Sequence, residues 1–266
     1  MSDSQKYALI TGGTSGIGFE LAKLFAKDKY NLVIVARDEQ ELNRAAADLK
    51  QYGVSVITMP KDLFRPENAF ELYDEVKSKG IDIDVLVNDA GQGQYGEFVD
   101  TDINRELNII QLNIMAPVIL TKCFLQDMVA RGQGRILNLA SIAGKMPGPL
   151  QSVYHGTKAF IHSWTEAIRS ELKDSGITVT SLLPGATDTD FFNKAEMQES
   201  KIVQEEKLAN PADVAKDGYK ALMSGDDMVI SGMKNKMQVG MSDLMPDSTV
   251  ADKMKKQQEP VNKDKK

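Results

Sequence analysis

Three side chains that can move or hold a proton lie close together in the middle of the chain. Tyr154 and Lys158 are one helical turn apart, and Ser141 precedes them. A phenol with its usual pKa of about 10 exchanges protons poorly at neutral pH unless a nearby cation favours its anion. We expect Lys158 to be that cation and to lower the pKa of Tyr154. A Tyr–Lys pair at this spacing is also common on exposed helix faces, so it needs supporting evidence elsewhere.

A glycine-rich turn, residues 11–18, follows the first apolar run and opens a helix. Small residues here let the backbone approach a pyrophosphate, and the helix N-terminus supplies free N–H groups. The spacing G-x3-G-x-G differs from the commoner G-x-G-x-x-G fingerprint, and a plain strand-to-helix turn is the alternative. The residues of this turn that we expect to bind a cofactor are Gly12, Thr14, Ser15, Gly16, Ile17 and Gly18.

The end of the second apolar run bears on which dinucleotide is bound. An acidic residue here suits the ribose 2'-hydroxyl of NAD, whereas an arginine suits the 2'-phosphate of NADP. The sequence reads Ala36-Arg37-Asp38. Asp38 is the rival acidic residue, but it also begins a capping-box pattern at the start of a helix. Arg37 therefore favours NADP. Asp62, just after the third apolar run, is either a contact to the adenine or the start of a turn.

These residues need a scaffold, and apolar runs alternate with helical patterns along the chain. This alternation predicts an α/β fold, a doubly wound (Rossmann) seven-stranded parallel sheet in a single domain. The expected strands are 7–10, 32–36, 54–59, 85–88, 135–140, 178–183 and 228–230. The expected helices are 16–28, 38–51, 66–79, 102–131, 152–174 and 211–223. We place the cofactor-binding domain and its substrate site at residues 1–232 and a tail rich in Met and Lys at 233–266, helical at first and disordered over 255–266.

In this order and spacing, the chain resembles the classical short-chain dehydrogenase/reductase family over residues 7 to about 230. The matching motifs are Thr11-Gly12-x-x-x-Gly16-x-Gly18, Asn88-x-Ala90-Gly91, Asn113, Ser141, Tyr154-x-x-x-Lys158 and Pro184-Gly185-x-Thr187. Asp89 stands where the family usually has a second Asn, which puts one local hydrogen bond in doubt.

The resemblance implies an NADP(H)-dependent oxidoreductase that transfers a hydride between nicotinamide and a carbonyl or alcohol. It assigns Tyr154 as the general acid/base, Ser141 to hold the substrate oxygen, and Lys158 to bind the nicotinamide ribose. Asn113 is the relay position. Pro117 has no N–H to donate, so we expect the carbonyl of Asn113 to be left free. The remaining cofactor contacts that it implies are Asn88, Ala90, Gly91, Pro184, Gly185 and Thr187.

Composition and charge limit the other classes. The 266 residues carry a net charge of −6, which argues against nucleic-acid binding. One cysteine excludes an intrachain disulfide, and a polar N-terminus suggests a cytoplasmic protein. The stretch 108–125 is interrupted by polar residues, so we expect no membrane span. His155 and His162 have no partner at ligand spacing, so we expect packing roles and no metal.

The substrate site should lie among the segments 91–96, 142–150 and 186–207. Their apolar residues suggest a hydrophobic carbonyl or alcohol substrate, and the helix around Tyr154 carries enough apolar surface for a homodimer or homotetramer. Met233, Met237, Met241 and Met245 recur every four residues, predicting a Met-lined lid over the pocket or a covering or subunit-contact helix. The alternatives to an enzyme of this kind are a non-catalytic NADP-binding regulator and a longer sugar-nucleotide epimerase relative.

Overall fold

The computed structural model describes residues 5–261, and its centre is a seven-stranded parallel sheet in the order β3-β2-β1-β4-β5-β6-β7. The strands are β1 (Tyr7–Thr11), β2 (Asn31–Ala36), β3 (Val56–Pro60), β4 (Val85–Asn88), β5 (Gly134–Leu139), β6 (Ile177–Leu183) and β7 (Met228–Ile230). The predicted doubly wound fold and its strands are confirmed, with boundaries within about two residues. The order reverses between β1 and β4, so loops leaving these neighbouring strands diverge there.

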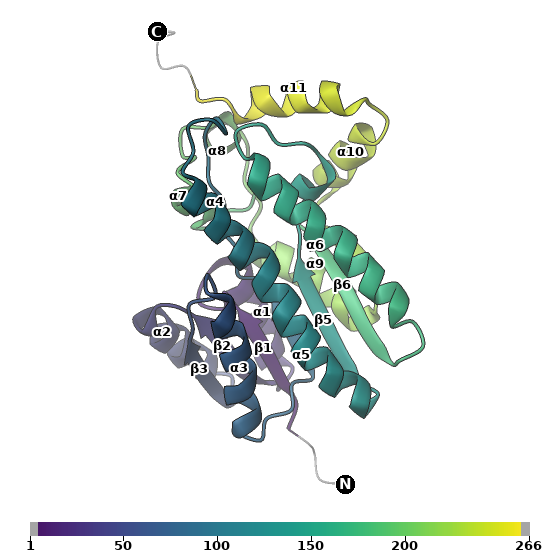
Figure 1. Ribbon diagram of the computed structural model, residues 1–266. Coiled ribbons are helices and arrows are strands. Elements are labelled where there is room, and N and C mark those ends of the chain that lie inside the picture. Colours follow the sequence, from purple (N-terminus) through teal and green to yellow (C-terminus); the bar gives the residue numbers. More distant parts are fainter. Residues whose placement is uncertain (1–4, 262–266) are drawn as a thin grey trace.

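Helices cover both faces of the sheet (Figure 1). One face carries α1 (Gly16–Lys27), α2 (Glu39–Lys50) and α9 (Pro211–Ser224), and the other carries α3 (Pro66–Ser78), α5 (Ala116–Arg131) and α6 (Ser152–Glu171). Because both faces are covered, the central strands are apolar at successive positions and not at alternate ones. Leu32, Val33, Ile34 and Val35 of β2 are all fully buried.

The long helix predicted over 102–131 is divided in the structure. Its parts are α4 (Ile103–Ile110), a π-helical turn η1 (Gln111–Met115) and α5. Pro117 has no N–H to donate to the carbonyl of Asn113 and its ring crowds that carbonyl, so the widened turn accommodates the proline. The π-turn bonds the N–H of Ala116 to the carbonyl of Gln111 and carries Asn113 at its centre.

The same stretch bears on the expectation that the chain has no membrane span. Over Ile103–Arg131 the mean hydropathy reaches 1.4 in an 18-residue window, so length and composition alone would allow a span. In the fold, 44% of that window is buried, because α5 packs against α3 and the sheet. α5 thus contributes side chains to the core of the domain.

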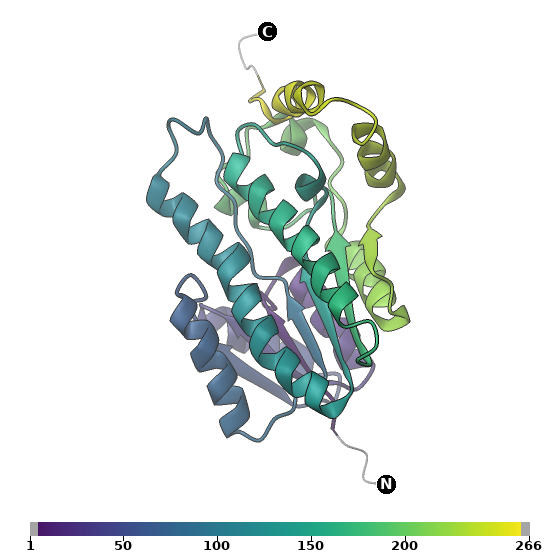
Figure 2. The same ribbon diagram turned by 45° about the vertical axis from the view of Figure 1, so that its right-hand side comes forward.

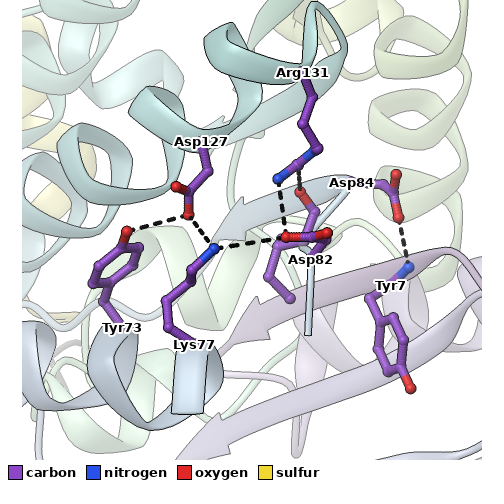
Figure 3. Close-up of polar contacts among 8 residues, drawn as sticks. Tyr7, Tyr73, Lys77, Asp82, Asp84, Asp127 and Arg131 are labelled. Atoms are coloured by element: carbon purple, nitrogen blue, oxygen red, sulfur yellow. Dashed lines mark hydrogen bonds and ion pairs between the residues drawn. The ribbon is translucent and has the colours of Figure 1, made fainter. Parts of the chain in front are cut away.

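The edge of the sheet at the amino ends of the strands is closed by a polar cluster (Figure 3). Lys77 of α3 pairs with Asp127 of α5 at 3.1 Å and with Asp82 at 3.6 Å. Arg131 donates to the carbonyl of Ile83 at 2.7 Å. These contacts tie α3 and α5 to the start of β4 at the end remote from the glycine-rich turn.

The C-terminal segment crosses the opposite end of the molecule as α10 (Met233–Ser242) and α11 (Asp247–Gln258) (Figure 2). Pro246 occupies the N-cap position of α11 without a capping hydrogen bond from its side chain. The predicted disorder over 255–266 is wrong for 255–261, which are ordered in α11 and a following bridge; residues 262–266 lie outside the described part of the chain. The short helices α7 (Phe191–Lys194) and α8 (Lys201–Glu205) and the 3-10 turn η2 (Ile142–Lys145) complete this end.

The methionine stripe faces away from the fold. Met233, Met237 and Met241 are 71%, 62% and 58% exposed and do not line the cavity, so the alternative of a Met-lined lid is wrong, whereas a covering or subunit-contact helix stays a prediction. The four-residue spacing correctly predicted that the methionines share one face of α10. The face of α10 that packs on the protein is a different one, which carries Val239 and Ser242.

Candidate active site

A cavity of about 650 Å³ lies beyond the carboxyl ends of the strands, where β1 and β4 diverge. It extends from the glycine-rich turn, past Tyr154, to α11. The predicted residues that line it are Gly12, Thr14, Ser15, Gly16, Ile17, Arg37, Ala90, Gly91, Ser141, Tyr154, Lys158, Pro184, Gly185 and Thr187. Four other predicted residues, Gly18, Asp62, Asn88 and Asn113, do not line it.

The glycine-rich turn is built for close backbone approach. Gly12 has φ +70°, and a Cβ there would lie 3.1 Å from the backbone of Ala90. A Cβ on Gly18 would lie 2.4 Å from Oδ2 of Asp89, so Gly18 serves packing between the turn and β4. Ser15 precedes α1 without capping it through its side chain, which leaves the first N–H groups of that helix available to an anion. These residues fit the pyrophosphate of a dinucleotide.

Arg37 and Asp38 have different roles. Arg37 lines the cavity, with its guanidinium 4.7 Å from the centre of the Phe64 ring. Asp38 accepts hydrogen bonds from the backbone N–H groups of Gln40 (2.8 Å) and Glu41 (2.9 Å) as the cap of α2. One of its oxygens is therefore already engaged by the helix.

Two predicted cofactor contacts have structural roles. The side chain of Asn88 is buried and donates to Asn138 (2.8 Å) and Thr121 (3.0 Å), joining β4 to β5 and α5. Asp62 accepts from the N–H of Phe64 at 3.3 Å in a turn and faces a smaller neighbouring pocket. Sequence spacing placed both residues near the site but did not show which way each side chain points.

Tyr154 lies at the centre of the cavity on α6, and its ring packs 4.9 Å from the ring of Phe191. Burial raises the pKa of its phenol to about 12, while a hydrogen bond with Ser141 acts in the opposite direction. The Ser141 hydroxyl accepts from the N–H of Ala143 at 3.1 Å and donates to the carbonyl of Pro184 at 3.2 Å. It can rotate its proton toward a bound oxygen only by giving up the bond to Pro184.

Lys158 is buried next to this tyrosine. Its Nζ donates to the carbonyl of Leu139 at 2.7 Å and lies 5.8 Å from the centre of the Tyr154 ring. Burial lowers the pKa of Lys158 to about 8, and the charge of Asp89 counteracts part of that effect. The pKa of Tyr154 is therefore shifted upward by burial, opposite in direction to the lowering expected from Lys158.

Asp89 is the residue whose importance the sequence understated. Burial raises the pKa of its carboxyl to about 7, with the charge of Lys158 and a hydrogen bond from the N–H of Gly18 acting against this. The carboxyl sits beneath the glycine-rich turn, next to Gly12 and Gly18.

Asn113 connects three segments around the site without lining the cavity. Its Oδ1 accepts from the N–H of Gln92 at 3.0 Å, and its Nδ2 donates to the carbonyl of Gln92 (2.9 Å) and to Thr157 (3.0 Å). A Cβ on Gly91 would lie 3.3 Å from this Oδ1 and 3.5 Å from Nζ of Lys158, so the amide and the lysine lie close together.

Both histidines make packing contacts, as expected, but one of them also lines the cavity. His155 is buried, with Nδ1 2.8 Å from the carbonyl of Met146, but it also lines the cavity. His162 lies 3.2 Å from the hydroxyl of Ser181, and burial lowers its pKa to about 4. Within residues 5–261, no three His, Cys, Asp or Glu side chains gather as a metal site would require.

Sequence reasoning placed the tail over the pocket as one alternative, but it named the wrong residues. Asn235, Gln238, Met254, Gln257 and Gln258 line the cavity. The change in composition after Gly232 suggested a separate segment, and the only signal for these residues was the four-residue spacing of Val250, Met254 and Gln258.

Comparisons with known proteins agree with this geometry. A model of the family described as short chain dehydrogenase matches residues 6–200. Ketoacyl reductase HetN of Nostoc sp. is 32% identical over 228 residues, which cover 85% of this chain and 78% of that protein. Very-long-chain 3-oxoacyl-CoA reductase of Mus musculus is 33% identical over 187 residues, covering 67% of this chain and 58% of that protein.

Among solved structures, a short-chain dehydrogenase from Sphingobium yanoikuyae in complex with NADPH is similar with a TM-score of 0.80 and 29% identity, covering 91% of this chain and 96% of that one. The protein is an oxidoreductase of the short-chain dehydrogenase family.

Proposed function

We propose that this protein is an NADP(H)-dependent oxidoreductase that transfers a hydride between nicotinamide and an apolar carbonyl or alcohol, with Tyr154 as the general acid/base. One observation carries the proposal. Tyr154, Ser141 and Lys158 line the same cavity as the glycine-rich turn and Arg37. A proton-transfer group and a dinucleotide cradle thus share one cavity.

The chain's own residues divide the chemistry as follows. The nicotinamide, when bound, supplies or accepts the hydride. Tyr154 remains protonated at neutral pH because its pKa is raised, so it is ready to give a proton to the oxygen of a reduced carbonyl. Ser141 orients that oxygen, Lys158 supplies positive charge beside it, and Asn113 holds the loop at Gln92 against α6.

The preference for NADP rests on Arg37. Its guanidinium lies at the cavity wall beyond β2, where a ribose 2'-phosphate would need a bidentate cationic partner. Asp38, which would favour NAD, is engaged in capping α2. The Sphingobium protein of known structure is described with NADPH, which supports the same choice.

The apolar character of the substrate rests on the far wall of the cavity. Met146, Met197 and Phe192 are buried there, and Phe191 packs on Tyr154. Two relatives are named as ketoacyl and very-long-chain 3-oxoacyl-CoA reductases, so 3-oxoacyl thioesters are the first substrates to test.

The decisive experiment follows NADPH consumption with 3-oxoacyl thioesters, apolar ketones and aldehydes, using Tyr154→Phe as the matched inactive control. We expect turnover by the wild type, at least about 100-fold reduced in the variant because proton transfer is lost. Tight NADPH binding without turnover of any carbonyl would instead favour a non-catalytic NADP-binding regulator.

Assembly as a homodimer or homotetramer is part of the proposal. Leu107, Met115, Val129 and Phe160 expose between 42% and 48% of their surface on the helices of one sheet face. A second copy covering these helices would bury this apolar surface. Size-exclusion chromatography with light scattering tests it, and a monomer at micromolar concentration would exclude it.

A further inference from the structure

One face of α11 is buried although the helix lies near the end of the chain. Val250, Met254 and Gln258 are only 4%, 6% and 1% exposed. Residues four apart share one side of a helix, so these three form a single stripe directed at the body of the molecule. Met254 and Gln258 line the cavity, and Val250 packs in the cluster that includes Ile142 and Leu183.

The end of this stripe is joined to the residue that follows Tyr154. The Nε2 atom of Gln258 lies 3.1 Å from Nε2 of His155, and both side chains are buried. The other ring nitrogen of His155 lies 2.8 Å from the carbonyl of Met146, which can only accept. Nδ1 of His155 must therefore carry the proton, which leaves Nε2 to accept from the Gln258 amide.

This assignment is consistent with the charge state of the imidazole. Burial lowers the pKa of His155, so the ring is neutral at pH 7. The ring also lies against the backbone of Gly148, so closely that a Cβ on Gly148 would be 2.1 Å from it. His155 thus connects α11 and the loop at Met146 to the helix that carries Tyr154.

The apolar part of the stripe meets methionines from other segments. Met254 belongs to the same buried cluster as Met146, and the side-chain amide of Gln238 contacts both sulfur atoms at 3.9 Å. Methionine side chains are unbranched and adapt to irregular apolar shapes. A wall of this kind accommodates an extended apolar group better than a small polar one.

Ion pairs also hold the same helix against neighbouring segments. Lys255 pairs with Glu97 at 3.2 Å, and Lys201 pairs with Glu259 at 3.2 Å. These pairs are partly exposed and contribute little individually. The buried contact between Gln258 and His155 joins this helix to the helix that carries Tyr154, and the hydroxyl of Tyr95 also donates to the carbonyl of Gln258.

We propose that α11 is the wall that determines substrate length: Met254 limits the apolar group that fits, and Gln258, held by the positioning residue His155, fixes this wall relative to Tyr154. This proposal rests on the proposed function and names the specificity-determining part of the same site. It assigns the tail a role in substrate binding and none in cofactor binding.

The first test is a length series. The full-length wild type, Met254→Trp and Met254→Ala are compared on a homologous series of straight-chain methyl ketones with NADPH. The matched control is Met237→Trp, the same substitution at an exposed methionine of α10. Met254→Trp should lower kcat/KM about tenfold or more for the longest ketones and leave the shortest nearly unchanged, because the indole fills the end of the cavity. Met254→Ala should move the optimum to longer ketones.

The second test addresses the positioning role. Gln258→Met removes the amide that His155 accepts from while keeping a similar volume, and Lys256→Met is the control on the exposed side of α11. Gln258→Met should raise KM for the longer ketones about tenfold with kcat and the NADPH dissociation constant within about twofold of wild type. If Gln258 had a purely structural role, Gln258→Met would instead weaken NADPH binding and lower the melting temperature as well as raise KM.

A binding measurement separates the proposed role of α11 from the proposed oxidoreductase function. The affinity of each protein for the apolar dye 1-anilinonaphthalene-8-sulfonate is measured by fluorescence, and Met254→Trp should weaken it whereas Met237→Trp should not. If the wild type reduces no carbonyl, the proposed function fails, and the dye result still decides the role of α11. Unchanged length profiles in an active enzyme, or equal dye affinity in all three proteins, would overturn the inference.

Discussion

Asp89→Asn restores the amide that the family usually has at this position, and we expect it to stabilise the protein in a strongly pH-dependent manner. Oδ2 of Asp89 lies beneath the glycine-rich turn, where a Cβ on Gly12 or Gly18 would touch it. The carboxyl accepts from the N–H of Gly18, and Lys158 is the cation that acts on it. An asparagine keeps the acceptor oxygen and removes the buried negative charge.

The magnitude follows from the pKa. Burial raises the pKa of Asp89 from 3.8 to about 7. The contribution of Asp89 to the free energy of unfolding is therefore fully present below about pH 4, and it is lost as the pH rises toward 7. A difference of about 3 pH units corresponds to roughly 4 kcal/mol, at about 1.36 kcal/mol per unit. Because the loop can relax around the charge, we expect Asp89→Asn to gain about 2–4 kcal/mol at pH 8 and less than half of that at pH 5.

The assay is urea unfolding at pH 5 and pH 8, with melting temperatures as a second readout. For a chain of this size 1 kcal/mol shifts the melting temperature by about 2–4 °C, so the expected rise at pH 8 is about 5 °C or more. Asp38→Asn is the matched control, because Asn also caps helices and Asp38 is exposed. An equal gain at both pH values, or a wild type that is most stable at pH 8, would refute the reasoning.

Three further predictions concern the reaction and its cofactor. Arg37→Asp should weaken NADPH binding by about 2–4 kcal/mol through lost pairing and new repulsion; dissociation constants for NADPH and NADH check this, and an unchanged NADPH constant would remove Arg37 from the site. Alcohol oxidation should accelerate as the pH rises toward the Tyr154 pKa of about 12, whereas carbonyl reduction should not, because only oxidation needs the phenolate; parallel pH profiles in both directions would contradict this. Pro117→Ala restores an N–H that lets η1 close into a regular helix, so kcat should fall several-fold as Asn113 loses its contacts with Gln92 and Thr157, while NADPH binding stays the same; a variant with wild-type kcat would show that the π-turn serves packing alone.

The sequence determined the scaffold because its signals are local. Apolar runs such as 7–10 and 32–36 are continuous because both faces of these strands are covered, and this continuity indicates parallel strands without knowledge of their neighbours. Caps and breakers such as Asp38 and Pro246 mark helix ends by the backbone groups that they satisfy or lack. The motif around Tyr154 and Lys158 could be recognised for the same reason, since both residues lie on one helix.

Tertiary structure decided what each side chain faces and how strongly it is desolvated. Asn88 was expected at the cofactor but is turned into the sheet by Asn138, a residue fifty positions away. The methionines of α10 form a stripe in any helix, and only the packing of α10 shows that the stripe faces outward.

The pKa values depend on the same information. Lys158 was expected to lower the pKa of Tyr154, yet burial raises it, because the free energy of a charge depends on every atom around it and not on its sequence neighbours. Asp89, Gln258 and His155 likewise gained their roles only when the strand ends and α11 came together at one cavity. Spacing along the chain specifies which residues share a helix or a strand end, and the folded packing alone specifies which of them meet.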